Sequence, residues 1–508
     1  MSLLAASALT TVRNIIFMTE IRKDAVIELD ITDVNNLGNG VGRVDGRVVF
    51  VRGAVSGDRV SAKVIKVNKS FAVARLMSVL TPSPNRCESE FCSAPLSCGG
   101  CVYRHITYEH ELELKRGYVK AAFAKAGLGE AQILPVLSAG RVSGYRNKAQ
   151  YPVARGKNGV FAGFYAAKTH NVLPAEDCAI QNEGFVAIVR FVCRFATENE
   201  WSVYDEESGR GLLRHIYLRR GERTGQTMLC LVINGESLPD GESFARELTA
   251  EFPSIVSVMI NLNKENTNVV LGDKYRVLWG KSGIDDELCG LRFFISPDSF
   301  YQVNRDGAEL LYGTAADMAE LCGGEILMDL YCGTGTIGLS MAHKVKRLVG
   351  VEIVEGAVRC ARENAQRNGI ANAEFICADA GDKETILRAA GGVRPDAVIM
   401  DPPRKGSTRE LVDCLSDLGV PKVVYVSCDS DTLARDVAWF CERGYRMSAV
   451  QPVAQPCHAR NSCICRQRGT GYIECYYRSA LIRGTSDANK RVRAPSANCA
   501  GCSTAFGR

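Results

Sequence analysis

The second half of the chain alternates short apolar segments with charged segments of helical period, and this order restricts the fold more than any other feature. Strands are expected at residues 326–331, 374–377, 397–400 and 423–426, and helices at 355–368 and 409–418. Strands and helices that alternate in this way form a parallel sheet with helices on both faces. From about residue 290 the sequence therefore predicts a doubly wound α/β domain. Ligands of such sheets bind outside the carboxyl ends of the strands.

Two of these strand ends carry reactive side chains. One strand stops at Ser427-Cys428-Asp429, and an earlier one runs into Asp401-Pro402-Pro403-Arg404-Lys405-Gly406. Both motifs are expected to face one crevice, where the thiol of Cys428 can act as a nucleophile. The alternative is that Cys428 is one more buried cysteine among the 21 in the chain.

A glycine-rich turn that contains Gly333, Gly335 and Thr336 follows the first of these strands. So tight a backbone admits a cofactor close to the main chain. Glu352 ends the next strand, where an acidic group can hydrogen-bond ribose hydroxyls, and Asp379 follows the strand after that. These features predict an adenosyl cofactor. S-adenosylmethionine fits best, and NAD is the alternative.

The N-terminal region has a different pattern. Residues 23–80 alternate apolar and polar positions in short runs separated by glycines, which predicts a small β-barrel. The segment Gly38-Asn39-Gly40-Val41-Gly42 precedes a strand rather than a helix, which argues against a nucleotide-binding loop. A basic face with one aromatic side chain is expected to bind oligonucleotides, and a solvated lysine face is the alternative. Its members are Lys63, Lys66, Lys69, Phe71 and Arg75.

The middle of the chain begins with a cysteine-rich loop at residues 84–101, followed by an expected helix at 107–126. Further strand segments, at 163–165, 228–233 and 269–272, predict an α+β domain. The loop has the pattern Cys92-x5-Cys98-Gly99-Gly100-Cys101, and Cys178 lies far downstream. Four thiolates suit an iron-sulfur cluster or structural zinc, and the spacing alone does not choose between them.

Composition sets the broad class. A chain of 508 residues with 46% apolar residues is expected to form three soluble domains, and it has no apolar run long enough for a bilayer. The cysteines indicate a reducing compartment, so a cytoplasmic location is expected. The net charge of +5 does not indicate nucleic-acid binding, because residues 457–508 contribute +7 and the rest −2.

Four motifs in a fixed order carry a family resemblance over residues 21–456. They are Ile295-Ser296-Pro297-Asp298-Ser299-Phe300-Tyr301-Gln302-Val303-Asn304, the Gly-Thr-Gly turn, residues 401–406, and Val426-Ser427-Cys428-Asp429. In these motifs the chain resembles the bacterial 5-methyluridine RNA methyltransferases of the TrmA/RumA type. The N-terminal barrel looks like their TRAM domain.

The resemblance implies an S-adenosylmethionine-dependent enzyme that methylates C5 of a uridine in RNA. Cys428 would add to C6 of the uracil ring, which activates C5. The target base would be single-stranded or flipped out of its helix. The expected cofactor and uracil pocket consists of Gln302, Tyr331, Gly333, Gly335, Thr336, Glu352, Asp379 and Asp401. Amino-group methylation of a base also uses an Asp-Pro-Pro turn, but Arg404 and Cys428 argue against it.

The same resemblance implies a [4Fe-4S] cluster held by Cys92, Cys98, Cys101 and Cys178, with Cys87 as a replacement for Cys92. The cluster would be structural and would help to position RNA. The barrel and the cluster together favour 23S ribosomal RNA over transfer RNA as the substrate, and a monomer is expected. Either phosphate contact or a solvated surface is expected for Arg146, Asn147 and Lys148.

The chain departs from the family after residue 456. Family members place a general base in a His-x-Glu sequence about thirty-five residues beyond the nucleophile, whereas residues 455–463 contain no carboxylate here. Glu474 is the candidate replacement, and Glu442 is the other Glu downstream of Cys428. The tail holds six of the 21 cysteines. We interpret it as a reading-frame change, with an authentic basic RNA-binding tail as the alternative. A catalytically impaired RNA-binding protein is a further alternative.

Five segments are therefore expected. They are an N-terminal extension (1–20, with Met18 as the true initiator), a TRAM barrel (21–80), a central domain (81–290), a methyltransferase domain (291–456) and an atypical tail (457–508).

Overall fold

The computed structural model describes residues 21–87, 92–95, 97–454 and the strand at 481–486. The chain divides into two compact units, one formed by Met1–Ser89 and Val102–His110 and the other by Glu90–Cys101 and Glu111–Arg508. The predicted extension, Met18, Glu474 and most of the atypical tail lie outside the described residues. Within the described part, no helix combines the length and apolar composition that crossing a bilayer requires.

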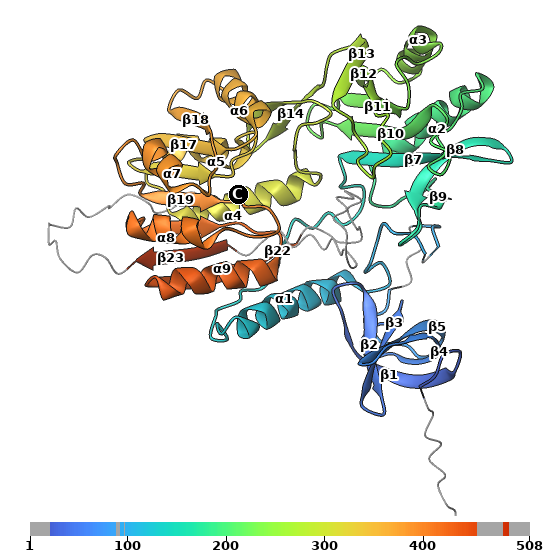
Figure 1. Cartoon of the computed structure of the whole chain (residues 1–508), viewed down its shortest axis with the longest axis horizontal. Helices are drawn as coiled ribbons and strands as arrows, with labels where there is room; N and C mark the ends of the chain where they lie inside the picture. Colours follow the sequence, from blue (N-terminus) through green and yellow to red (C-terminus); the bar gives the residue numbers. More distant parts are fainter. Residues whose placement is uncertain (1–20, 88–91, 96, 455–480, 487–508) are drawn as a thin grey trace, which may run out of the picture. The chain divides into compact units, whose positions relative to one another are not determined.

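The first unit contains a closed five-stranded barrel (Figure 1), as the sequence predicts. Its strands are β1 (Val26–Val34), β2 (Asn39–Val44), β3 (Arg47–Arg52), β4 (Arg59–Val67) and β5 (Phe71–Thr81), in the order β1-β2-β3-β5-β4. Alternate residues such as Ile27, Leu29 and Ile31 fill the interior. Strand β2 begins directly after Gly38, so the glycine-rich segment is a strand entry and not a nucleotide loop.

The central part of the second unit is a seven-stranded sheet in the order β13-β12-β11-β10-β7-β8-β9. Its strands are β7 (Lys148–Gly156), β8 (Gly159–Tyr165), β9 (Val172–Pro174), β10 (Leu213–Arg220), β11 (Thr227–Ile233), β12 (Ile255–Leu262) and β13 (Lys274–Gly280). Two helices, α2 (Glu183–Glu198) and α3 (Gly241–Glu251), contribute to its hydrophobic core. The α+β character expected for this region is confirmed. Helix α1 (Tyr108–Lys125) agrees with the helix expected at 107–126.

The strand expected at residues 269–272 is wrong, because this segment is a loop. Two buried asparagines take the place of a strand partner. Asn263 Nδ2 donates to Val269 O at 2.7 Å and to Val270 O at 3.0 Å. Asn261 accepts from Gly272 N and donates to Gly272 O, each at 2.7 Å. These side chains satisfy the loop's backbone groups, so the apolar run needs no sheet.

The C-terminal sheet has the order β18-β17-β16-β19-β20-β23-β21, in which β23 is Leu481–Ser486. The parallel strands are β16 (Ile326–Leu330), β17 (Arg347–Glu352), β18 (Ala373–Cys377), β19 (Ala397–Met400) and β20 (Lys422–Tyr425), and β21 is Tyr445–Gln451. The chain moves outward from β16 to β18 and then returns to the other side of β16 as β19. The switch point therefore lies between β16 and β19, where ligands of open α/β sheets bind.

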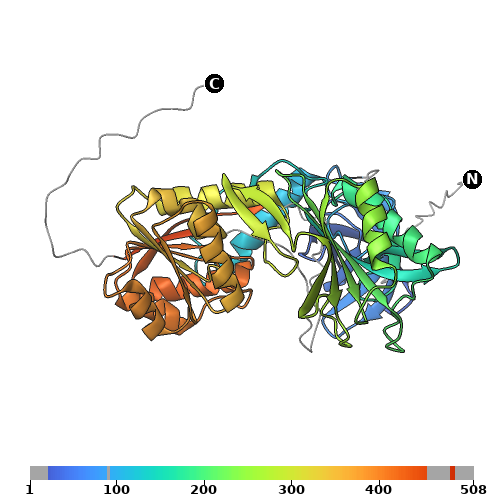
Figure 2. The same ribbon diagram turned by 90° about the horizontal axis from the view of Figure 1, so that it is seen from above.

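Helices cover both faces of this sheet (Figure 2). On one face, α4 (Arg305–Ala319), α5 (Thr336–Met341) and α6 (Glu355–Arg367) pack on residues such as Leu327 and Ile399. On the other, α7 (Lys383–Ala390), α8 (Arg409–Asp417) and α9 (Ser430–Glu442) pack on the alternate residues, such as Met328 and Val398. Strands buried on both faces read as continuous apolar runs, which is why the sequence pattern identified them. A short hairpin of β14 (Ile284–Leu288) and β15 (Leu291–Ile295) precedes the domain.

Strand β23 (Leu481–Ser486) comes from the atypical tail and enters this sheet. It pairs antiparallel with both β20 and β21 and separates them. Sequence analysis assigned no strand to this Arg-rich segment. The backbone pairing gives part of the tail a defined position inside the sheet, next to the edge strand β21.

Candidate active site

The glycine-rich turn follows β16 at the switch point. Gly333 and Gly335 have φ values of +56° and +79°, and Tyr331 also has a positive φ of +62°. Such a conformation is strained for a tyrosine and ordinary for glycine. Apart from Gly333 itself and its two chain neighbours, no atom of the described residues lies within 4 Å of the position that a Cβ on Gly333 would take. The turn therefore leaves open space directly above its backbone, where a ligand can approach.

Glu352, at the end of β17, holds this turn from the neighbouring strand. Its Oε2 accepts from Gly333 N at 3.1 Å, and its Oε1 accepts from Val354 N at 2.9 Å. Asp379 is exposed beyond the end of β18, and its carboxylate accepts from Gly381 N at 2.8 Å. Both acids lie at the carboxyl ends of adjacent strands, as the sequence predicts.

Asp329 is a titratable residue of this region to which the sequence analysis gave no role. It is 1% exposed, and Gly338 N donates to its Oδ2 at 2.9 Å. Burial raises the pKa of Asp329 to about 8, and the charges of Asp401 and Glu352 act in the same direction. A protonated Asp329 is uncharged, so at neutral pH only Asp401 and Glu352 of these three carboxyl groups carry a negative charge.

Gly338 also completes the spacing Gly333-x-Gly335-x-x-Gly338, so the full dinucleotide pattern is present and does not by itself exclude NAD. A Cβ on Gly338 would lie 2.6 Å from Asp329 Oδ2. The third glycine thus permits the close packing of α5 on β16. Thr336 begins α5, and its Oγ1 lies 3.2 Å from Tyr312 Oη.

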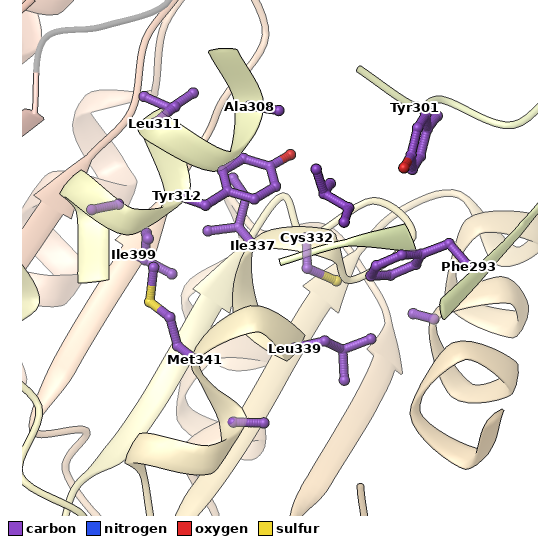
Figure 3. Close-up of a cluster of buried hydrophobic side chains, with 14 of the residues drawn as sticks. Phe293, Tyr301, Ala308, Leu311, Tyr312, Cys332, Ile337, Leu339, Met341 and Ile399 are labelled. Carbon is purple, nitrogen blue, oxygen red and sulfur yellow. The ribbon is translucent and has the colours of Figure 1, made fainter. Parts of the chain in front are cut away.

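Two thiols follow parallel strands of this sheet, Cys332 after β16 and Cys428 after β20, and their environments differ. Cys332 is 6% exposed and belongs to the apolar cluster in which Figure 3 shows Tyr312 and Ile337. Burial raises the pKa of Cys332, and nearby Asp329 and Glu352 raise it further, so it stays protonated. Cys428 is only half-buried. It lies two residues before Ser430, the first residue of α9.

The turn around Cys428 is held by its two neighbours. Ser427 Oγ donates to Asp429 O at 2.9 Å, and Asp429 N donates back to Ser427 Oγ at 3.1 Å. The Asp429 side chain caps α9 by accepting from Thr432 N at 2.9 Å. The backbone on both sides of Cys428 is therefore fixed, and the residue itself is half-buried.

The Asp-Pro-Pro loop begins where β19 ends. Asp401 N donates to Leu330 O at 3.3 Å, so the loop starts beside the glycine-rich turn. Tyr331 faces this loop: burial raises its pKa, while the neighbouring Ser407 side chain opposes the shift. The structure thus brings Tyr331, Asp401 and Cys428 to one edge of the sheet.

Gln302 lies in the loop before α4 and is 7% exposed. Its Nε2 is buried without a hydrogen-bond partner among the described residues. An orphaned buried donor has a substantial desolvation cost, which a ligand's acceptor atom would offset. Gln302 therefore fits the binding role that the sequence assigned to it.

Two buried residues hold this loop, one on β10 and one directly before β7, and sequence reasoning missed both roles. Arg219, on β10, donates to Ser299 O at 2.8 Å and to Tyr301 O at 2.9 Å. Asn147 donates from its backbone N to Val303 O at 2.9 Å and from Nδ2 to Gln302 O at 2.8 Å. No local pattern marks them, because both contact a loop about 80 or more residues away.

The suggested phosphate contact of Asn147 is wrong. The residue is fully buried, and its side chain is committed to Gln302 O. Arg146 and Lys148 remain partly exposed on either side of it.

The cysteine-rich loop is fixed close to Cys178. Ser93, next to Cys92, donates from N and Oγ to the carboxylate of Asp177, each at 2.8 Å. Burial raises the pKa of Cys178 to about 11, and charge on Cys92 and Cys98 contributes to this increase. Three thiols thus lie within electrostatic reach, and Cys101 packs in the same small cluster as Cys178.

The described residues contain no group of three or more His, Cys, Asp or Glu arranged around a single metal ion. The donor set itself fits an iron-sulfur cluster, whose separate irons take one thiolate each. Cys87 lies in the other unit, where its N donates to His105 O at 3.0 Å.

The basic face of the barrel is partly available to a ligand. Lys66, Lys69 and Arg75 are exposed, whereas Lys63 forms an ion pair with Asp24 at 3.0 Å. The ring of Phe71 packs edge-on against Phe50, with 5.5 Å between their centroids.

Comparison with known proteins agrees with this arrangement. Residues 284–448 match the family model described as tRNA (Uracil-5-)-methyltransferase, and residues 24–77 match the TRAM domain. A relative from Clostridium tetani (strain Massachusetts / E88), described as an uncharacterized RNA methyltransferase, is 40% identical over 435 residues, 85% of this chain and 94% of the relative. A second from Listeria monocytogenes serotype 4b (strain F2365), with the same description, is 39% identical over 439 residues, 85% of this chain and 95% of the relative.

A solved structure matches most of the chain. The Pyrococcus abyssi tRNA (uracil-54, C5)-methyltransferase, in complex with S-adenosyl-L-homocysteine, has a TM-score of 0.71 and 25% sequence identity, and the match covers 90% of this chain and 98% of that chain. The expected TRAM barrel and methyltransferase fold are confirmed. The chain therefore belongs to the tRNA (uracil-5-)-methyltransferase family of RNA methyltransferases.

Proposed function

We propose that this enzyme methylates C5 of a uridine in 23S ribosomal RNA through a covalent bond between Cys428 and C6 of the base. The observation that carries the proposal is the half-buried thiol of Cys428 in a fixed turn, at the same sheet edge as the open glycine-rich turn and Asp401. Cys332, the thiol that follows β16 at this edge, is buried, and burial raises its pKa.

We assign the cofactor pocket to residues around the glycine-rich turn. S-adenosylmethionine supplies the methyl group when it is bound. The open space above Gly333 admits it close to the backbone, and the orphaned Nε2 of Gln302 donates to it or to the base. The remaining members of the pocket are Tyr331, Gly335, Thr336, Glu352, Asp379 and Asp401.

The Cys428 thiolate adds to C6 of uracil, and the ring electrons pass to C5 and the C4 carbonyl. C5 then takes the methyl group as its bond to the sulfonium breaks. A base removes the C5 proton, and the returning electron pair expels the thiolate from C6. Glu474 remains our candidate for that base, and it lies outside the described residues.

Ribosomal RNA is proposed because the chain combines a TRAM barrel with a four-cysteine set, which we propose holds a [4Fe-4S] cluster at Cys92, Cys98, Cys101 and Cys178. Transfer RNA is the second candidate, since the Pyrococcus abyssi structure is that of a transfer-RNA enzyme. We further propose that the enzyme is a monomer. We also propose a cytoplasmic location, because the 21 cysteines suit a reducing compartment.

The test uses anaerobically purified full-length protein with labelled S-adenosylmethionine and two undermethylated substrates, 23S RNA and transfer RNA. We expect 5-methyluridine in 23S RNA, its loss in Cys428→Ala, and normal activity in Cys360→Ala, which removes a half-buried thiol of α6. Methylation of transfer RNA alone would refute the ribosomal assignment. Full activity of Cys428→Ala would refute the nucleophile.

Iron and sulfide analysis tests the cluster separately from activity. We expect about four irons and four sulfides per chain, and their loss in Cys178→Ser but not in Cys193→Ser, a buried thiol of α2. Stoichiometric zinc without sulfide would contradict the cluster.

A further inference from the structure

A single buried carboxylate on α9 ties the Asp-Pro-Pro loop to the elements that hold Cys428. Asp436 has no exposed surface. Its Oδ2 accepts from Tyr425 Oη at 2.6 Å and from Ser407 N at 2.7 Å, and its Oδ1 accepts from Arg435 Nε at 2.8 Å. All three partners therefore donate to one side chain.

These contacts reach both ends of the nucleophile turn. Tyr425 is the last residue of β20, three positions before Cys428. Asp436 itself lies on α9, which begins two positions after Cys428. The turn that carries Cys428 is thus anchored on both sides to the same carboxylate.

The same carboxylate fixes the far end of the Asp-Pro-Pro loop. Ser407 N also lies 3.2 Å from Tyr425 Oη, and Arg435 Nη2 donates to Lys405 O at 2.8 Å. Gly406 has a φ of +78°, and a Cβ there would lie 2.5 Å from both Arg435 Nη2 and Asp436 Oδ2. The loop approaches the network as closely as only glycine permits.

We propose that Asp436 is a positioning residue. It fixes the loop that carries Asp401 and Arg404 at a set distance and orientation from the Cys428 thiol, so that the uracil ring and the thiol meet in a reactive geometry. This inference rests on the proposed function. Asp436 touches no reacting atom. It acts through two rigid segments, each of which carries a residue of the site.

The chemistry of the network explains why a neutral amide cannot replace the carboxylate. Ser407 N and Arg435 can only donate, so both need an acceptor. In Asp436→Asn one of the two oxygens becomes an NH2 group, which places a donor against a donor. Because a displacement of about 1 Å can cost on the order of 10²-fold in rate, covalent addition should be very sensitive to this change.

The experiment measures cofactor binding and covalent addition separately. Substrate RNA containing 5-fluorouridine has no C5 proton to lose, so its adduct accumulates whatever the general base is. Adduct formation is followed on denaturing gels for the wild type, Asp436→Asn, Tyr425→Phe and Asp413→Asn. Asp413 is a partly exposed α8 carboxylate paired with Arg443 at 3.4 Å, and it is the matched control.

We expect Asp436→Asn to slow adduct formation on the order of 10²-fold and Tyr425→Phe about tenfold, with the calorimetric affinity for S-adenosylmethionine unchanged. Asp413→Asn should match the wild type. A folded Asp436→Asn that forms adduct at the wild-type rate would overturn the inference, as would parallel losses of cofactor affinity and adduct formation. If Asp436→Asn does not fold, Tyr425→Phe decides by the same criteria. A wild type that forms no adduct would refute the proposed function instead.

Discussion

Asp329→Asn should remove a pH dependence of stability that originates beneath the glycine-rich turn. Burial raises the pKa of Asp329 from 3.8 to about 8, with Asp401 and Glu352 adding to the shift. Between these two values the folded chain keeps a proton that the unfolded chain loses. The contribution of Asp329 to the free energy of unfolding is therefore complete below its pKa in the unfolded chain, and it is lost as the pH rises toward its pKa in the folded chain.

The slope follows from the number of protons. One proton bound in the folded state and none in the unfolded state lowers the free energy of unfolding by ~1.4 kcal/mol per pH unit. From pH ~5.5 to ~7.5 the wild type should thus lose about 3 kcal/mol that Asp329→Asn keeps. The amide is neutral throughout, and its oxygen can still accept from Gly338 N.

Denaturant unfolding at several pH values provides the measurement, and the difference between the two proteins cancels the other titrating groups. The control is Asp396→Asn, a partly exposed carboxylate that accepts from Ile326 N at 2.9 Å at the other end of β16. Its pH profile should run parallel to that of the wild type. If the Asp329→Asn profile is also parallel to the wild type, the raised pKa is refuted.

Three further perturbations test the scaffold. Arg219→Met, compared with Arg219→Lys, leaves the carbonyls of Ser299 and Tyr301 in the Gln302 loop without donors. We expect weaker S-adenosylmethionine binding by calorimetry and a free energy of unfolding lower by about 3 kcal/mol. Unchanged cofactor affinity would contradict this expectation. Gly338→Ala should cost about 1 to 3 kcal/mol in denaturant unfolding, because the new Cβ would lie 2.6 Å from Asp329 Oδ2, and a neutral effect would show that α5 can shift. Asp58→Ala removes the carboxylate that accepts from the N–H groups of Val55 and Ser83 and from the partly buried Arg86. We therefore expect the free energy of unfolding to fall by about 3 kcal/mol. An unchanged melting curve of the barrel would refute this expectation.

The sequence grouped several candidate residues correctly in space, because parallel strands display their carboxyl ends at one edge. Tyr331, Glu352, Asp401 and Cys428 follow four such strands, so locating the strands was enough to group the residues. The strand expected at 269–272 failed for the opposite reason. Its apolar pattern is local, whereas the Asn261 and Asn263 side chains that replace a strand partner are not visible in that pattern.

The sequence by itself determined the α/β class, the barrel and the family, because periodicity and strand-end motifs depend on neighbouring residues along the chain. Only the tertiary structure decided which polar residues are buried and what they hold. Asn147 and Arg219 support the Gln302 loop, Asp436 joins the Asp-Pro-Pro loop to β20 and α9, and β23 enters the sheet from an Arg-rich tail. Such contacts depend on the three-dimensional register of segments distant in sequence, and no local pattern of side chains encodes that register.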